Sequence, residues 1–192
     1  MSEKQRCGWC NSSELYQNYH DHEWGEPVFD DKKIFEFLIL ETFQAGLSWI
    51  TILKKRENFR LAFDDFDYYK IANYNENKVQ ELLQNTEIVR NQLKIRAAIT
   101  NAHQFIATQK EFGSFYSYIW KFTNGKPIVN APKTLKDVPA TTPLSDTISK
   151  DLKKRGFKFV GSTVVYAHMQ ATGMVNDHLE DCWKKTTVHI NL

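Results

Sequence analysis

Cysteine and histidine residues gather near both ends of the chain. Cys7 and Cys10 belong to a Cys-Gly-Trp-Cys sequence, and His178 precedes Cys182 by four residues. On a helix, a four-residue interval places the imidazole and the thiolate on one face. Tetrahedral zinc is held by four such nitrogen or sulfur ligands. These residues therefore predict a structural zinc site that ties the N-terminal segment to a C-terminal helix.

Spacing alone does not choose the other two ligands of this site. Cys7, Cys10, His20 and His22 are all candidates. A thioredoxin-type redox pair is an alternative for the two cysteines, but it requires a βαβ setting that the sequence lacks. Unligated cysteines and surface histidines are the other alternative.

One carboxylate occupies an otherwise apolar helix face. Glu41 follows Leu38 by three residues and Ile34 by seven, which places it on the stripe that faces the core. A buried carboxylate is costly unless it has partners. Two interpretations follow: a hydrogen-bond anchor that caps a neighbouring helix, or a pocket carboxylate that binds a polar or cationic ligand.

Aromatic side chains accompany this carboxylate. Trp9, Tyr19, Trp24 and Trp49 lie near the N-terminus or just after Glu41. Aromatic faces attract cations, so rings beside a carboxylate suit a flat cation such as a methylated purine. Ordinary packing is the alternative for each ring, and it is favoured for Trp24.

Residues 152–161 predict two helices joined by a short turn. Gly156 ends the first helix and Gly161 precedes the second. Unpaired backbone N–H groups at such a turn suit a phosphate, and the basic run 153–155 adds attraction without sequence preference. This pattern is typical of a helix-hairpin-helix, with an ordinary αα-corner as the alternative. A second basic run lies at 54–56. For both basic runs, the alternative interpretation is a solvated helix face.

Helical periodicity dominates the rest of the chain. Asp30 or Asp31 is expected to cap the helix that carries Glu41, Ser48 the next helix, and Asn75 another. Further helices are predicted over 91–109 and 115–122, from Ser145 to Leu152, and from Gly161 to Gly173. The proline-containing stretch 124–142 is expected to be a loop or extended crossing between two lobes. Sustained two-residue alternation is absent, so the predicted fold is all-α.

Composition supports one packed domain. The chain has 192 residues, of which 42% are hydrophobic and 14% aromatic. The formal charge of +2 does not identify a nucleic-acid binder, because clustering matters more than the total. The charged N-terminus and the lack of a long apolar run predict a cytoplasmic protein with no secretory signal or membrane span. Its three cysteines then make a poor disulfide framework.

Longer motifs make the chain resemble the bacterial 3-methyladenine DNA glycosylase I family of the helix-hairpin-helix superfamily. The motifs are RCGW at 6–9, YHD through EWG at 19–25, QAGLSWI at 44–50, LKKREN at 53–58, the hairpin 152–161, and VNDH at 175–178. The resemblance covers nearly the whole chain. It implies a single all-α glycosylase domain over 1–192 with two lobes. The terminal segments with the zinc site form one lobe, and roughly residues 30–120 form the other.

The resemblance also implies which residues hold the metal. Carried across by position, the ligands of one structural Zn²⁺ per chain are Cys7, His20, His178 and Cys182. Cys10 departs from the family pattern and is expected to be a spare thiol beside the metal.

Roles in base and DNA binding follow from the same resemblance. Glu41 and Tyr19 are expected to be catalytic, and together with Trp9 and Trp49 they bind the base. Asp177 follows the hairpin but adjoins a zinc ligand, so no catalytic role is assigned to it. The DNA-binding residues are Gly46 and Leu47, which fill the gap left by the extruded nucleotide, and Gly156, Lys158 and Gly161 of the phosphate-gripping hairpin.

The implied activity is hydrolysis of the N-glycosidic bond of 3-methyladenine flipped out of double-stranded DNA. Methylation at N3 already makes adenine a cationic leaving group. A strong general acid and a covalent lysine intermediate are therefore not expected, and the enzyme should be a monofunctional monomer. The main alternative is a zinc-stapled DNA-binding protein without catalysis, in which Glu41 is only a helix anchor.

Overall fold

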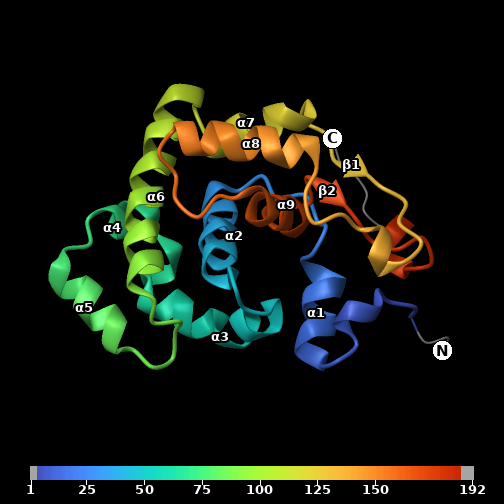
Figure 1. Ribbon diagram of the computed structural model, residues 1–192, viewed down its shortest axis with the longest axis horizontal. Helices are drawn as coiled ribbons and strands as arrows, with labels where there is room; N and C mark the ends of the chain where they lie inside the picture. The colour runs from blue at the N-terminus through green and yellow to red at the C-terminus, as the bar shows by residue number, and fades with distance from the viewer. Residues whose placement is uncertain (1–3, 187–192) are drawn as a thin grey trace.

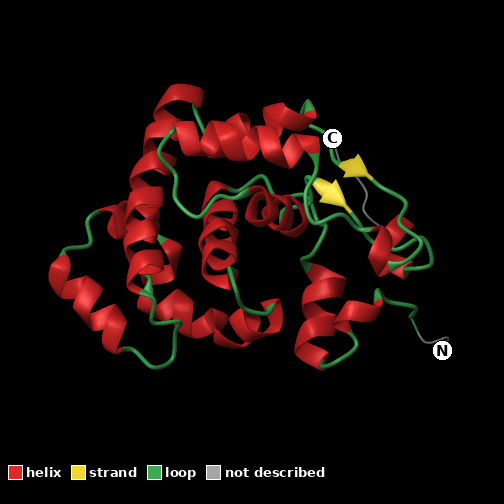
Figure 2. Ribbon diagram, viewed as in Figure 1, coloured by secondary structure: helices red, strands yellow, loops and turns green. Residues whose placement is uncertain are grey.

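The computed structural model describes residues 4–186, and these are mostly helical (Figure 2). The α-helices are α1 (Glu14–His22), α2 (Asp31–Gln44), α3 (Trp49–Ala62), α4 (Tyr68–Ala72), α5 (Glu76–Gln84), α6 (Gln92–Phe112), α7 (Phe115–Trp120), α8 (Pro143–Lys154) and α9 (Ser162–Ala171). Short 3-10 turns are η1 (Gly8–Cys10), η2 (Asp64–Phe66), η3 (Lys121–Thr123), η4 (Leu135–Asp137) and η5 (Trp183–Thr186). Two-residue strands β1 (Ile128–Val129) and β2 (Val175–Asn176) pair in parallel. The prediction of a helical fold is confirmed.

Several helices begin at the residues expected from the sequence. The side chains of Asp30, Asn75 and Asn91 accept hydrogen bonds from backbone N–H groups of the first turns of α2, α5 and α6. Ser48 precedes α3, but its hydroxyl bonds to the Thr51 hydroxyl rather than to the backbone.

The predicted start of α8 is wrong. Thr142 is the N-cap and Ser145 lies in the first turn, where the two residues form a reciprocal capping box. A Ser in a capping box resembles a Ser that starts a helix, so the pattern placed the start three residues too late.

Helix α2 lies at the centre of the molecule (Figure 1). It packs against α3, α6, α7 and α9, and every residue from 34 to 43 is buried. A helix that is surrounded on all sides needs apolar residues on all sides, and α2 has only two buried carboxylates. Glu36 is paired with Arg56 and Arg60 at 2.8 and 2.9 Å. Glu41 has no such ion pair among the described residues.

Neither basic run is simply a solvated helix face. Arg56 is 7% exposed and donates hydrogen bonds to Glu36 and Glu23. Arg155 binds Glu111 and Asp151. The arginine of each run therefore stabilises contacts between elements of the fold.

The predicted crossing 124–142 lies beside the segment that follows α9. Ile128 N–H donates to Met174 O at 2.9 Å, and Asn130 N–H donates to Asn176 O at 3.1 Å. The helix expected to carry His178 and Cys182 is absent from this segment, which forms an irregular turn instead. A four-residue interval is compatible with either conformation. Within residues 4–186, no helix is long and apolar enough to cross a bilayer.

Candidate functional site

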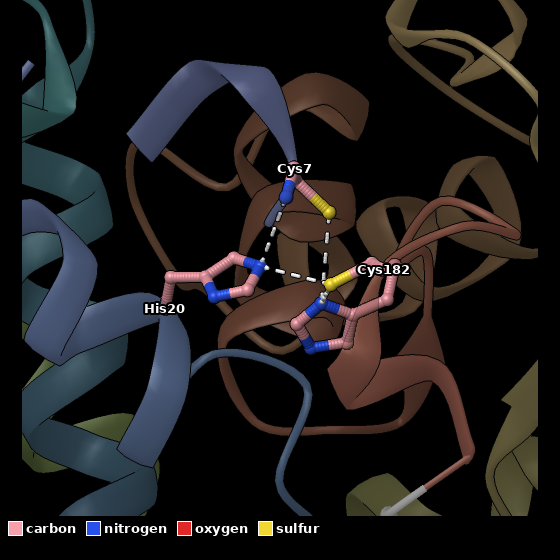
Figure 3. A group of neighbouring side chains, drawn as sticks. Cys7, His20 and Cys182 are labelled. Atoms are coloured by element: carbon pink, nitrogen blue, oxygen red, sulfur yellow. Dashed lines mark hydrogen bonds between the residues drawn. The ribbon is translucent and has the colours of Figure 1, made fainter. Parts of the chain in front are cut away.

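Four side chains from distant parts of the chain form a buried cluster. Figure 3 shows Cys7, His20 and Cys182 directed toward one another, and His178 completes the group. Their ligand atoms all lie within 4.8 Å of one another. Cys182 Sγ is 3.4 Å from His20 Nε2 and 3.6 Å from His178 Nδ1, and Cys7 Sγ is 3.7 Å from the same Nδ1. Tetrahedral zinc places sulfur and nitrogen ligands about 3.6 Å apart, so these residues fit a tetrahedral metal ion.

Outer hydrogen bonds orient both imidazoles for such an ion. His20 Nδ1 is 2.8 Å from the Asp21 carboxylate, which also accepts hydrogen bonds from Arg6. His178 Nε2 is 3.1 Å from Trp24 O. These contacts leave His20 Nε2 and His178 Nδ1 facing the cluster, as is usual for histidine ligands of metals. Burial opposes ionisation of Asp21, but its hydrogen bonds with Arg6 and His20 lower the pKa to about 2.

The two other candidate ligands lie outside this cluster. Cys10 is buried and its thiol donates to Cys7 O at 3.1 Å, whereas His22 is exposed. The cysteines at 7, 10 and 182 are all free. The described strands are two residues long and do not form the βαβ setting of a thiol oxidoreductase.

A cavity of about 360 Å³ adjoins the cluster. Its lining includes the four side chains that the family resemblance assigned to base binding: Trp9, Tyr19, Glu41 and Trp49. The full lining is Trp9, Tyr16, Tyr19, Trp24, Glu41, Gln44, Trp49, Leu135, Val138, Ala167, Gln170 and Asp177.

Glu41 is the distinctive polar group of this cavity. Its side chain is 4% exposed, and its buried Oε2 has no hydrogen-bond partner. Burial raises the pKa of Glu41 to about 8. An anchor that caps a neighbouring helix would be hydrogen-bonded to that helix, so that interpretation is wrong. Trp49 Nε1 is likewise buried without a partner, which leaves two polar atoms available to a ligand.

Aromatic rings form most of the cavity wall. The ring of Trp9 lies edge-on to Tyr16 and Trp24, with centroids 4.9 and 5.0 Å apart. The rings of Tyr19 and Trp49 are tilted, with centroids 5.3 Å apart. Packing was the favoured role for Trp24. Its ring does pack edge-on against His178, with ring centroids 4.7 Å apart, but Trp24 also lines the cavity.

Other lining residues were not identified from the sequence. Tyr16 precedes Tyr19 by three residues and Gln44 follows Glu41 by three, so helical spacing could have identified both. Leu135, Val138, Ala167 and Gln170 come from the crossing and from α9. No local pattern connects these residues with Glu41.

Asp177 also lines the cavity, and it differs from Glu41 in its partners. Its carboxylate accepts hydrogen bonds from Asn130, Tyr166 and Gln170 at 2.7, 2.6 and 2.8 Å. It thereby joins the crossing to α9. Three donors satisfy this carboxylate, while the Oε2 atom of Glu41 has none.

The turn between α2 and α3 presents an apolar side chain beside the cavity. Leu47 is 42% exposed and lies between two lining residues, Gln44 and Trp49. Gly46 has φ +83, a conformation that glycine adopts without strain. The glycine therefore allows the chain to leave α2, expose Leu47 and return to the cavity at Trp49.

The hairpin has the predicted arrangement between α8 and α9. Gly156 follows the end of α8, Lys158 is exposed, and Gly161 is the N-cap of α9. Phe157 and Val160 are buried and attach the turn to the core. Gly161 has no side chain with which to cap α9, so the first N–H groups of this helix are available to an anion.

Comparison with known proteins agrees with this geometry. Residues 9–185 match the family described as Methyladenine glycosylase. The chain is 49% identical over 178 residues to DNA-3-methyladenine glycosylase 1 of Escherichia coli K12, covering 93% of this chain and 95% of the relative. It is 48% identical over 182 residues to DNA-3-methyladenine glycosylase of Haemophilus influenzae, covering 95% and 98%. A crystal structure of a 3-methyladenine DNA glycosylase I variant in complex with 3-methyladenine has a TM-score of 0.91 and 36% identity, covering 94% of this chain and 97% of that chain.

Proposed function

This chain belongs to the methyladenine glycosylase family, and we propose that it is a monofunctional DNA-3-methyladenine glycosylase that releases 3-methyladenine from alkylated double-stranded DNA. The observation that carries this proposal is the unpartnered carboxylate oxygen of Glu41 inside an aromatic cavity. A buried polar atom without a partner is unfavourable unless a ligand supplies one. The cavity volume of about 360 Å³ suits a small planar molecule.

The base reaches this cavity by leaving the DNA stack. Unstacking costs a few kcal/mol and less for a damaged base. Leu47 fills the vacated space, and the hairpin residues Gly156, Lys158 and Gly161 hold a phosphate of the same duplex. The exposed positions of Leu47 and Lys158 support these roles.

Inside the cavity, the rings of Trp9 and Trp49 contact the faces of the flipped base and favour its positive charge. Glu41 Oε2 accepts a hydrogen bond from the purine edge, and Trp49 Nε1 donates one to an acceptor. Because the pKa of Glu41 is about 8, the free protein carries this carboxyl protonated at neutral pH. A cationic base favours the ionised form, so the proton leaves as the base binds.

The chemical step needs little acid or base catalysis. Methylation at N3 makes the base a cationic leaving group, and the sugar develops oxocarbenium character before water attacks it. Glu41 stabilises the positive charge. Burial raises the pKa of Tyr19 well above its ordinary value, so this hydroxyl stays protonated and acts as a hydrogen-bond donor. None of the lining residues is a lysine, which supports hydrolysis without a covalent imine.

The metal cluster supplies structure rather than chemistry. We propose that it holds one Zn²⁺ per chain, because two thiolates and two imidazoles form a typical closed tetrahedral site. Cys7, His20, His178 and Cys182 would occupy all four positions and leave none for water. We also propose that the protein is a cytoplasmic monomer that acts on chromosomal DNA.

The test is release of methylated purine from alkylated duplex DNA by the folded protein, with Glu41→Gln as the variant. We expect wild-type release of 3-methyladenine and a weaker affinity of the variant for the free base. Loss of a hydrogen bond to a charged group corresponds to about 10–100-fold in affinity. Glu36→Gln is the matched control, because Glu36 is buried on the same helix but is absent from the cavity lining. No release by the folded wild type, with DNA binding retained, would instead support a non-catalytic DNA-binding protein.

A further inference from the structure

Helix α6 contacts both of the turns that we assign to DNA. Figure 1 shows the α8–α9 hairpin passing beside α6. Asn101 donates to Lys158 O at 3.0 Å and accepts from Lys158 N–H at 2.7 Å. In the first turn of the same helix, Lys94 Nζ donates to Phe43 O at 2.9 Å and to Ala45 O at 2.6 Å, at the end of α2.

These two polar residues share one face of α6. They are seven residues apart, which is two helical turns or about 10 Å along the axis. The contacts at one end of this face hold the turn that exposes Leu47, and those at the other end hold the hairpin. The two turns are more than a hundred residues apart in sequence, so α6 sets their relative position.

Local chemistry does not favour a lysine at position 94. The N-terminus of a helix carries partial positive charge and disfavours a cation. Lys94 is also only 6% exposed, and burial lowers its pKa. A role in tertiary structure accounts for a buried cation at this position better than the stability of α6 does.

The contacts of Lys94 with the end of α2 account for its burial. The last carbonyl groups of a helix lack partners within the helix. Lys94 binds those of Phe43 and Ala45, while Leu47 N–H donates to the intervening Gln44 O. Three consecutive carbonyl groups are thereby satisfied, and the direction in which Leu47 leaves the helix is fixed.

Asn101 has the corresponding role at the hairpin. Its side chain is fully buried, and its amide group makes two hydrogen bonds, both with the backbone of Lys158. The next residue, Phe159, has φ +55, which is uncommon for a bulky side chain. Such a conformation persists only where the surroundings hold it, and Asn101 binds the backbone immediately before it.

We propose that Lys94 and Asn101 are positioning residues of base excision, which make α6 a spacer between the Leu47 turn and the phosphate-binding hairpin. The inference rests on the proposed function. The hairpin holds the backbone of a duplex while Leu47 enters its stack, so a change in their separation misplaces the base. Small misplacements of about 1 Å can cost about 100-fold in rate.

The test compares Lys94→Met and Asn101→Leu, which keep side-chain size but remove the hydrogen bonds. We expect each folded variant to excise 3-methyladenine from duplex DNA at least about 10-fold more slowly in single turnover. Binding of the free base, followed by quenching of pocket tryptophan fluorescence, should change less than about twofold, because neither residue lines the cavity. The double variant should lose less excision activity than the two single variants together, expressed as free energy. Loss of either contact is already enough to change the distance between the two turns.

Lys55→Met is the matched control. Lys55 also donates to two backbone carbonyl groups, those of Thr86 and Glu87, which belong to neither of the two DNA-facing turns. It should retain wild-type excision. If Asn101→Leu does not fold, Asn101→Asp replaces it, because aspartate keeps the acceptor for Lys158 N–H and loses the donor to Lys158 O.

Two results would overturn the spacer role: duplex excision unchanged in the folded variants, or free-base binding reduced as much as excision. The second result would mean that the cavity itself had been damaged. An inactive wild-type protein would contradict the proposed function instead, so the two failures are distinguishable.

Discussion

Tyr19 and His20 are consecutive residues of α1, and they belong to two different sites. Tyr19 lines the aromatic cavity, whereas His20 directs Nε2 into the buried cluster. The same adjacency recurs at Asp177, which lines the cavity, and His178, which completes the cluster. The cluster therefore supports two walls of the cavity directly.

Removal of one cluster ligand is expected to weaken both sites. We predict that Cys182→Ser lowers the metal content and the melting temperature and also weakens binding of free 3-methyladenine. Saturating metal at 100 times its Kd adds about 2.7 kcal/mol, which corresponds to about 5–11 °C in a chain of this size. Metal analysis, thermal unfolding and tryptophan fluorescence measure the three effects. Cys10→Ser is the control and should keep its metal; loss of the metal from that variant would contradict the assignment of Cys7.

Gly25 should be sensitive to the smallest substitution. A Cβ at this position would lie 3.0 Å from His178 Nε2, and the backbone φ of +79 is unfavourable for other residues. Gly25→Ala is therefore expected to displace the His178 imidazole and weaken metal binding, measured by competition with a chelator. Gly113→Ala is the matched control, since its φ is +84 and its Cβ would have no neighbour within 4 Å. Equal metal affinity in the two variants would contradict a role for the contact with His178.

Glu41 should reduce stability as the pH rises. Burial raises its pKa from 4.5 to about 8, so between these values the folded protein keeps a proton that the unfolded chain releases. Its contribution to the free energy of unfolding is fully present below pH 4.5 and is lost as the pH rises to about 8. One pKa unit is worth about 1.4 kcal/mol, so Glu41→Gln should be a few kcal/mol more stable than wild type at pH 8. Denaturant titrations at pH 5 and pH 8 test this; an equal stability difference at both values would contradict it.

His168 should have the opposite pH dependence. It is buried between α9 and α2, where its Nε2 lies 3.1 Å from Ile34 O, and burial lowers its pKa from 6.5 to about 4. The unfolded chain binds a proton below pH 6.5 while the folded chain stays neutral, so stability falls as the pH falls toward 4. The loss is about 3 kcal/mol. His168→Gln should show a smaller decrease between pH 7 and pH 4.5 in urea unfolding, and an identical decrease in both proteins would exclude His168 as the cause.

Local sequence patterns predicted most of the helices, though not α1 or α4, and the burial of Glu41. Helical periodicity and backbone capping act over three to seven residues, so Asp30, Asn75 and Asn91 were informative about helix starts. The same local rules failed where two conformations share one pattern. Ser145 looked like an N-cap, and the interval between His178 and Cys182 looked helical.

Family resemblance supplied a ligand set that spacing alone left open. In the structure, Cys7 and His20 enter the cluster while Cys10 and His22 do not. The two-lobe division stays a prediction, as do the individual roles of Glu41, Tyr19 and Leu47.

The sequence by itself therefore determined the helical fold class, the family and the stripe on which Glu41 lies. Only the tertiary structure brought Leu135, Gln170 and Asp177 to the cavity and placed Lys94 against the end of α2. The reason is physical. A side chain's face on its own helix follows from backbone geometry, but its partners across the molecule depend on how whole helices pack, and no spacing within one helix encodes that.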